Sequence, residues 1–118
     1  MSVELQESIE RALALGGRPV LRLGSAGTSV TFTVTDDEDQ SVTLLLDRHP
    51  PETIAGVEPA EITIELDIAQ ANLFSTGELI LPNCILRDEV SWCGPVRKYL
   101  SLDPVLRGLL ARANDERT

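Results

Sequence analysis

The sequence predicts one α+β domain in which helices pack on a single layer of β-sheet. Three segments alternate apolar and polar residues at every second position, which is typical of strands with one face on a core. Helical periodicity occurs before the first of these segments and after the last. The 118 residues suit one domain, and 42% of them are hydrophobic. We therefore expect a two-layer domain over residues 1–118, without repeats or linkers.

The chain is expected to begin with an amphipathic helix over residues 2–15. Ser2 can cap its start, and Gly16 can end it because glycine accepts the left-handed conformation found after many helices. Its apolar positions recur at helical spacing: Leu5, Ile9, Ala12 and Leu13. The next apolar segment, 20–23, fits either a short strand or an extended connection.

Residues 30–93 are expected to form the sheet, with one helix inserted. Four acidic residues join the first two alternating runs, which predicts an antiparallel hairpin. Shorter strands are expected at 53–57 and 89–93, and in the second of these Val90 and Trp92 should share a face. The inward positions of the three main runs are Val30, Phe32, Val34, Val42, Leu44, Leu46, Ile62, Ile64 and Leu66.

The inserted helix should cover residues 69–75, starting from Asp67 or Ile68 and ending at Gly77. The apolar segment that follows, 79–86, has no regular pattern and contains a proline, so we expect it to be irregular.

Residues 95–113 are expected to hold the C-terminal helices. After a short helical turn at 96–100, Asp103 is predicted as N-cap and Pro104 as the first residue of a final helix. An apolar stripe runs along it: Leu102, Val105, Leu106, Leu109, Leu110 and Ala113. Such a stripe either fills the core or covers a ligand cavity, and we predict that it covers a cavity.

The net charge of −9 restricts the partners. Nucleic-acid binding draws much of its affinity from basic groups on phosphates, and the sequence has no basic stripe, so we expect no nucleic-acid partner. The acidity also argues against strong binding to anionic membranes. No apolar run approaches the ~20 residues that span a bilayer, and the N-terminus has no secretion-signal pattern. We expect a cytoplasmic protein whose ligand binding depends little on salt.

Candidate catalytic and metal-ligating residues are few and scattered. His49 could act as a general base, but it lies beside two prolines in a loop. Cys84 and Cys93 lack CxxC spacing, and one histidine does not complete a zinc site, so we expect reduced, metal-free thiols. Cys93 paired with His49 as a nucleophile is the catalytic alternative. With no phosphate-binding glycine loop either, we expect a protein that is not an enzyme and needs no cofactor.

Residues 30–102 resemble the sterol carrier protein 2 domain. The resemblance rests on Ile62-Thr-Ile-Glu-Leu66, Leu73-Phe-Ser-Thr-Gly77, Pro82 and Val90-Ser-Trp-Cys-Gly94. It implies a sheet of about five strands, mostly antiparallel, covered on one face by helices. The chain departs from the family pattern at Glu78 and Glu89, where the family has lysines, and at Pro95. These departures weaken the expectation of membrane-directed lipid transfer.

The resemblance also implies an apolar tunnel between sheet and helices that binds fatty acyl chains, sterols or similar lipids. The residues that fall on the tunnel-lining elements are Leu73, Phe74, Leu79, Leu81, Ile85 and Leu86, with Leu106, Leu109 and Leu110 on the closing helix. We therefore predict a non-catalytic carrier of an apolar small molecule. The alternative is a protein-interaction module, or a homodimer, that docks through an edge strand or the last helix.

Overall fold

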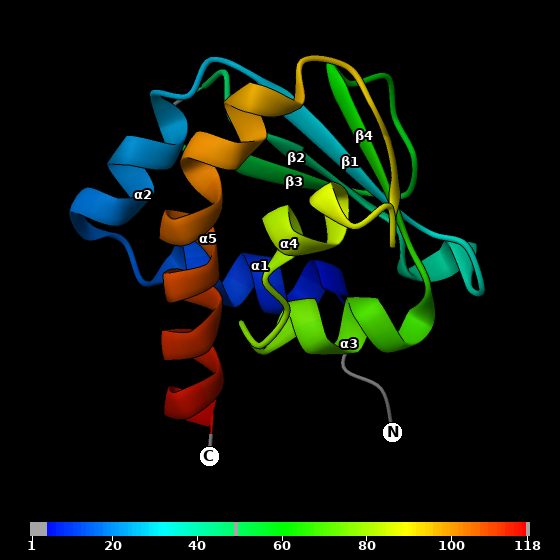
Figure 1. The fold of residues 1–118 in the computed structure, drawn as a ribbon. Coiled ribbons are helices and arrows are strands. Elements are labelled where there is room, and N and C mark those ends of the chain that lie inside the picture. Colours follow the sequence, from blue (N-terminus) through cyan, green and yellow to red (C-terminus); the bar gives the residue numbers. More distant parts are fainter. Residues whose placement is uncertain (1–4, 49, 118) are drawn as a thin grey trace.

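The computed structural model describes the backbone of residues 5–48 and 50–117 and the side chains of these residues as far as Asp115. Helices lie on one side of a twisted sheet (Figure 1). The elements in order are α1 (Leu5–Ala14), α2 (Gly17–Gly24), β1 (Ser29–Val34), η1 (Glu38–Gln40), β2 (Val42–Leu45), β3 (Glu52–Ala55), β4 (Ile62–Leu66), α3 (Ile68–Ser75), α4 (Leu81–Leu86), β5 (Ser91–Cys93) and α5 (Val96–Arg117).

The sheet has five strands in the order β3-β2-β1-β4-β5. The hairpin of β1 and β2 is antiparallel, as predicted, and so are the pairs β2–β3 and β4–β5. The central pair is parallel, with Val30 opposite Ile62 and Val34 opposite Leu66. The sheet is therefore mixed and mostly antiparallel, which confirms the predicted α+β class.

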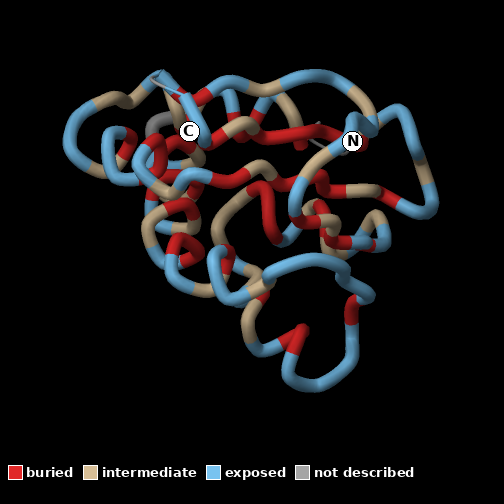
Figure 2. The backbone as a smooth tube through the Cα atoms, turned by 90° about the horizontal axis from the view of Figure 1, so that it is seen from above, coloured by how far each residue is buried: buried red, intermediate tan, exposed pale blue. Residues whose placement is uncertain are grey.

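The hydrophobic core lies between the sheet and the helical layer, and each of the helices α1 to α5 contributes buried residues to it. All nine predicted inward residues are buried. Eight of them lie on β1, β2 and β4, and the ninth, Leu46, directly follows β2. The ring of Phe32 lies 5.0 Å from that of Phe74 on α3 and 6.0 Å from that of Tyr99 on α5. Buried residues follow the strands and the inner sides of the helices (Figure 2). These aromatic contacts join both helices to the centre of the sheet.

The connection from β3 to β4 crosses the other face of the sheet. Thr31 donates its hydroxyl hydrogen to the carbonyl of Glu58 at 2.9 Å, and Thr43 donates to the carbonyl of Gly56 at 3.1 Å. Both threonines are buried, although they lie on the polar side of their strands. The crossing leads the chain from the edge at β3 to a position beside β1.

Helix α3 begins and ends as predicted. The Asp67 carboxylate accepts a hydrogen bond from the backbone N–H of Gln70 at 2.7 Å, and the Gln70 side chain accepts one from the N–H of Asp67 at 2.9 Å. This reciprocal capping satisfies amides that have no partner within the helix. Gly77 follows with φ +80°, a conformation that favours glycine.

Two prolines stand inside helices that the sequence did not predict. Segment 20–23 is neither strand nor extended connection but part of α2, and 79–86 contains the short helix α4. Pro19 and Pro82 occupy the first turns, where an N–H has no helical partner and its absence costs nothing. The sequence predicts that Pro82 interrupts its segment, whereas in the structure it lies at the start of α4.

Segment 96–100 is helical, as predicted, but α5 is continuous, which corrects the prediction of a separate final helix capped by Asp103. Asp103 lies inside α5, is fully buried, and accepts a hydrogen bond from the hydroxyl of Tyr99. Pro104 cannot donate to the carbonyl of Leu100, and the first turns of α5 are tilted against the rest (Figure 1).

Strand β5 starts one residue after Val90. Val90 is buried, but Trp92 keeps 44% of its surface exposed, although it pairs with Ile64. The prediction that Val90 and Trp92 share a face did not anticipate this difference, because β5 is an edge strand with a neighbour on one side only.

Candidate functional site

An open groove of about 450 Å³ lies between α2 and α5. The two helices are in contact, although they lie far apart in the sequence. In Figure 1, α2 lies beside the upper half of α5, away from the sheet centre. The residues that line the groove are Pro19, Arg22, Ser101, Pro104, Val105, Gly108, Leu109 and Arg112.

The floor of the groove follows one face of α5. Val105 and Leu109 are four positions apart, as are Pro104, Gly108 and Arg112, so their side chains stack along the same side of the helix. Leu109 is buried and links the floor to the core, while Val105 is half-buried. The floor is therefore apolar from Pro104 to Leu109, which is more than one helical turn.

Gly108 keeps this floor open. A β-carbon added there would meet no atom within 4 Å, so packing does not require a glycine at this position. A glycine within a helix costs about 1 kcal/mol relative to alanine. The chain thus has a less stable helix at Gly108 and a wider groove above it.

Two arginines stand at the rim, Arg22 on α2 and Arg112 on α5. Ion pairs to acidic residues involve five other basic side chains, namely Arg11, Arg48, Arg87, Lys98 and Arg107. Among the described residues, no ion pair involves Arg18, Arg22 or Arg112. The groove therefore has a positive rim on a chain whose net charge is −9.

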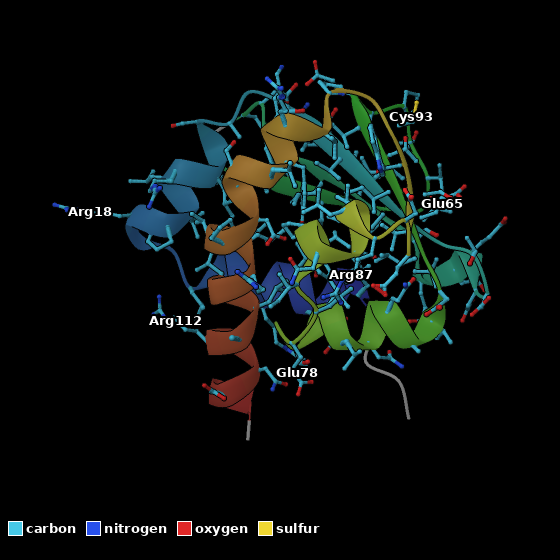
Figure 3. All side chains as sticks on the ribbon, viewed as in Figure 1. Arg18, Glu65, Glu78, Arg87, Cys93 and Arg112 are labelled. Carbon is cyan, nitrogen blue, oxygen red and sulfur yellow. The ribbon has the colours of Figure 1, made fainter. Side chains whose placement is uncertain are left out.

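A second, more open hollow of about 420 Å³ adjoins the groove and shares Arg22 with it. Arg18 and the exposed Leu21 also line this hollow, together with Ser25. Figure 3 shows Arg18 and Arg112 on the same flank of the molecule, opposite Cys93 and Glu65. Among the described residues, four arginines thus lack an ion pair; Arg18, Arg22 and Arg112 line these two hollows, and Arg97 lines neither.

The residues implied by the family resemblance lie mostly in the packed core. Those that are buried there are Phe74, Leu81, Ile85, Leu106, Leu109 and Leu110. Leu79 is half-buried, whereas Leu73 is 45% and Leu86 80% exposed. Of this set, Leu109 lines the groove, and Leu110 lines a hollow of only about 10 Å³ between α1, α3 and α5.

Sequence reasoning missed most of the groove. Pro19 and Arg22 were overlooked because their segment was not recognised as a helix, and no local pattern tells which helix α2 will contact. One signal was available in the last helix, where Gly108 and Arg112 lie four positions apart beside the apolar stripe. Gly108 interrupts an otherwise strong helical pattern at a cost of about 1 kcal/mol relative to alanine.

The structure shows where the candidate reactive groups lie. Cys84 is buried, and burial raises the pKa of its thiol, whereas Cys93 is exposed. His49 lies outside the described residues, so its pairing with Cys93 stays a prediction. Within residues 5–48 and 50–117, no three His, Cys, Asp or Glu side chains gather as metal ligands. The helices of the same ranges include none with the length and apolar character needed to cross a membrane.

Comparison with known proteins gives similarity of fold. No family model and no curated protein sequence matches the chain. Sterol carrier protein 2 from Yarrowia lipolytica superposes with a TM-score of 0.64 at 12% identity, over 88% of each chain. The sterol carrier protein domain 2 of Helicoverpa armigera gives 0.62 at 12% identity, over 93% of this chain and 85% of that one.

The same fold also occurs inside a larger enzyme. The sec-alkylsulfatase Pisa1 from Pseudomonas sp. matches with a TM-score of 0.55 at 18% identity, over 73% of this chain but 14% of the enzyme. The five-stranded order, the helical layer and these superpositions agree. The chain has the fold of a sterol carrier protein 2 domain.

Proposed function

We propose that this domain binds an apolar small molecule in the groove between α2 and α5 and catalyses no reaction on it. The observation that carries the proposal is the groove itself. Its volume of about 450 Å³ lies within the range of about 300–1,000 Å³ usual for small-molecule sites. Its floor of proline, valine, leucine and glycine offers apolar contact and few directional bonds, which favours loose selection by size.

The structural neighbours support the same class of ligand. Two of them are named as sterol carriers, and a third is an alkylsulfatase, an enzyme named for a substrate with an alkyl chain. The proposal differs from the expected sheet–helix tunnel in the place of the ligand. The buried leucines of the predicted tunnel pack against one another, and the groove lies on the outer side of α5.

Filling the groove tests the proposal. A fluorescent fatty-acid analogue should bind the parent protein in the low micromolar range, about −8 kcal/mol. Gly108→Leu should abolish binding, because a β-carbon there meets no atom within 4 Å and the larger side chain would extend into the open space above the floor. Leu86→Ser, at an exposed position that the family resemblance assigned to the ligand, should leave binding unchanged.

Unchanged binding in Gly108→Leu together with loss of binding in Leu86→Ser would instead place the ligand site on the α4 side of the domain. Failure of several acyl and sterol probes to bind a folded sample would refute the carrier function. Native mass spectrometry of freshly purified protein offers an independent check, because a co-purified lipid appears as added mass.

A protein-docking function is the second candidate, and one observation favours it. Three apolar side chains around α3 and α4 are between 45% and 80% exposed. Leu73 lies on α3, Ile80 directly precedes α4, and Leu86 is the last residue of α4. Exposed apolar side chains of this kind are typical of interaction surfaces when they form one patch. Charged substitutions at Leu73 and Leu86 would abolish such docking and leave acyl binding intact.

A further inference from the structure

We propose that the groove between α2 and α5 selects amphiphiles with an anionic head group, which Arg22 and Arg112 bind from opposite helices. The inference rests on the proposed function and names the class of ligand for that site. The apolar chain of the ligand lies on the floor formed by Pro104, Val105 and Leu109, and its head lies at the rim.

The charge distribution is the first argument. The chain has 19 acidic residues and 10 basic ones, so acidic partners for a surface arginine are abundant. Five basic side chains have such partners, yet within the described residues Arg22 and Arg112 have none. Arg18, in the adjoining hollow, is in the same situation. Three guanidinium groups on one flank are thus left for a ligand to neutralise.

The chemistry of the guanidinium group is the second argument. Its planar fork donates paired hydrogen bonds to carboxylate, phosphate or sulfate oxygens, and it is more weakly hydrated than an ammonium group. An apolar wall beside it lowers the local dielectric constant and strengthens the attraction for an anion. Arg22 and Arg112 have such a wall, because Pro19, Val105 and Leu109 line the same groove.

The arrangement also explains the glycine. Gly108 precedes Arg112 by about one helical turn, and both residues line the groove on the same side of α5. A larger residue at 108 would occupy the path between apolar floor and positive rim. Chain and head group are therefore accommodated by neighbouring turns of the same helix.

Titration calorimetry with ligands of equal chain length tests the proposal. Dodecanoate and dodecyl phosphate, below their micelle concentrations, distinguish carboxylate from phosphate heads. Dodecanol is the uncharged counterpart, and inorganic phosphate tests the anion without a chain. The variants are Arg22→Gln and Arg112→Gln. Arg97→Gln is the matched control, because Arg97 is exposed, forms no described ion pair and lines neither hollow.

We expect each groove variant to weaken binding of the charged ligands about tenfold, since a hydrogen bond to a charged group contributes about 1.5–3 kcal/mol. Dodecanol binding should change by less than about twofold, because its hydroxyl has no charge for the arginine to attract. Arg97→Gln should have no effect on any ligand. Higher salt should weaken the charged ligands alone, which revises the salt independence expected from the sequence.

Two results would overturn the head-group inference and leave the proposed function intact. One is equal binding of dodecanol and dodecanoate that neither arginine variant changes. The other is an equal loss of both ligands in Arg22→Gln and Arg112→Gln. Binding of inorganic phosphate as tightly as dodecyl phosphate would show an anion site instead of an amphiphile site. Absence of binding by all four ligands to the folded parent would refute both proposals.

Discussion

Tyr99 donates its hydroxyl hydrogen to the Oδ1 atom of Asp103 at 2.7 Å, one turn further along α5, and both side chains are fully buried. The guanidinium Nε of Arg107 lies 3.7 Å from the other oxygen, Oδ2. Among the described residues, Oδ2 has no hydrogen-bond partner. Burial raises the pKa of Asp103, an effect that the Tyr99 hydroxyl and the charge of Arg107 oppose in part. The carboxylate is thus held inside the core on the helix that forms the groove.

The first prediction concerns pH. Because the pKa of Asp103 is higher in the folded state, its contribution to stability is full below the unfolded value of about 3.9 and is lost as pH rises through the folded pKa. Asp103→Asn removes this loss, so the variant should gain stability relative to the parent as pH rises from 4 to 7. Urea denaturation of both proteins across this range measures the difference. A difference that falls with pH would show that the charged carboxylate stabilises α5.

A companion variant tests the hydrogen bond. Tyr99→Phe removes the donor and leaves Asp103 buried without it, which should cost about 1.5–3 kcal/mol at pH 7. The cost should shrink at low pH, where Asp103 is protonated. A cost that stays equal at pH 4 and pH 7 would assign the effect to packing.

The second prediction concerns the approach of α3 to α5. Gly77 has φ +80°, and a β-carbon there would lie 2.8 Å from the backbone nitrogen of Ala111 and 2.9 Å from the carbonyl oxygen of Arg107. Gly77→Ala should therefore cost more than the ~1–2 kcal/mol of the left-handed conformation alone. Gly27→Ala is the matched control, because Gly27 has φ +65° and open space around it. Equal losses in the two variants, measured by chemical denaturation, would mean that α5 shifts easily.

The third prediction separates core from groove on α5. Leu106 is fully buried and lines neither hollow beside α2, so Leu106→Ala should cost about 2–5 kcal/mol and leave ligand affinity unchanged. The sequence, by contrast, predicts that this residue covers a ligand cavity. Leu86→Ala, at an 80% exposed position, should change stability by less than about 0.5 kcal/mol. A small loss of stability in Leu106→Ala together with weakened ligand binding would instead support a ligand cavity covered by Leu106.

The fourth prediction concerns the two thiols. Cys93 is exposed and should react quickly with a thiol reagent, whereas Cys84 is buried with a raised pKa and should react only as the protein unfolds. Labelling with and without urea, followed by mass spectrometry, counts the fast and slow thiols. Two equally slow thiols, or a mass two units low, would contradict the prediction of free thiols.

The local sequence pattern was enough to predict the strands and both ends of α3. Alternation at period two marks which side of each strand is apolar, so the inward residues of β1, β2 and β4 were predicted correctly. The start of α3 was equally local, because Asp67 and Gln70 cap the helix through atoms three residues apart. Helix α4 was missed because Pro82 is compatible with a first turn and with an interruption alike, and α2 was missed because segment 20–23 also fits a short strand.

The sequence by itself determined the α+β class, the inward faces of the strands and the apolar stripe of the last helix, since each depends on neighbours within a few residues. The tertiary structure decided the parallel pairing of β1 with β4, the continuity of α5 and the groove. Arg22 and Arg112 are 90 positions apart and share a rim only because α2 packs on α5. Burial of Leu106 and exposure of Leu86 were settled in the same way, because a leucine is equally apolar in a core and at a surface, and only the packed neighbours decide between them.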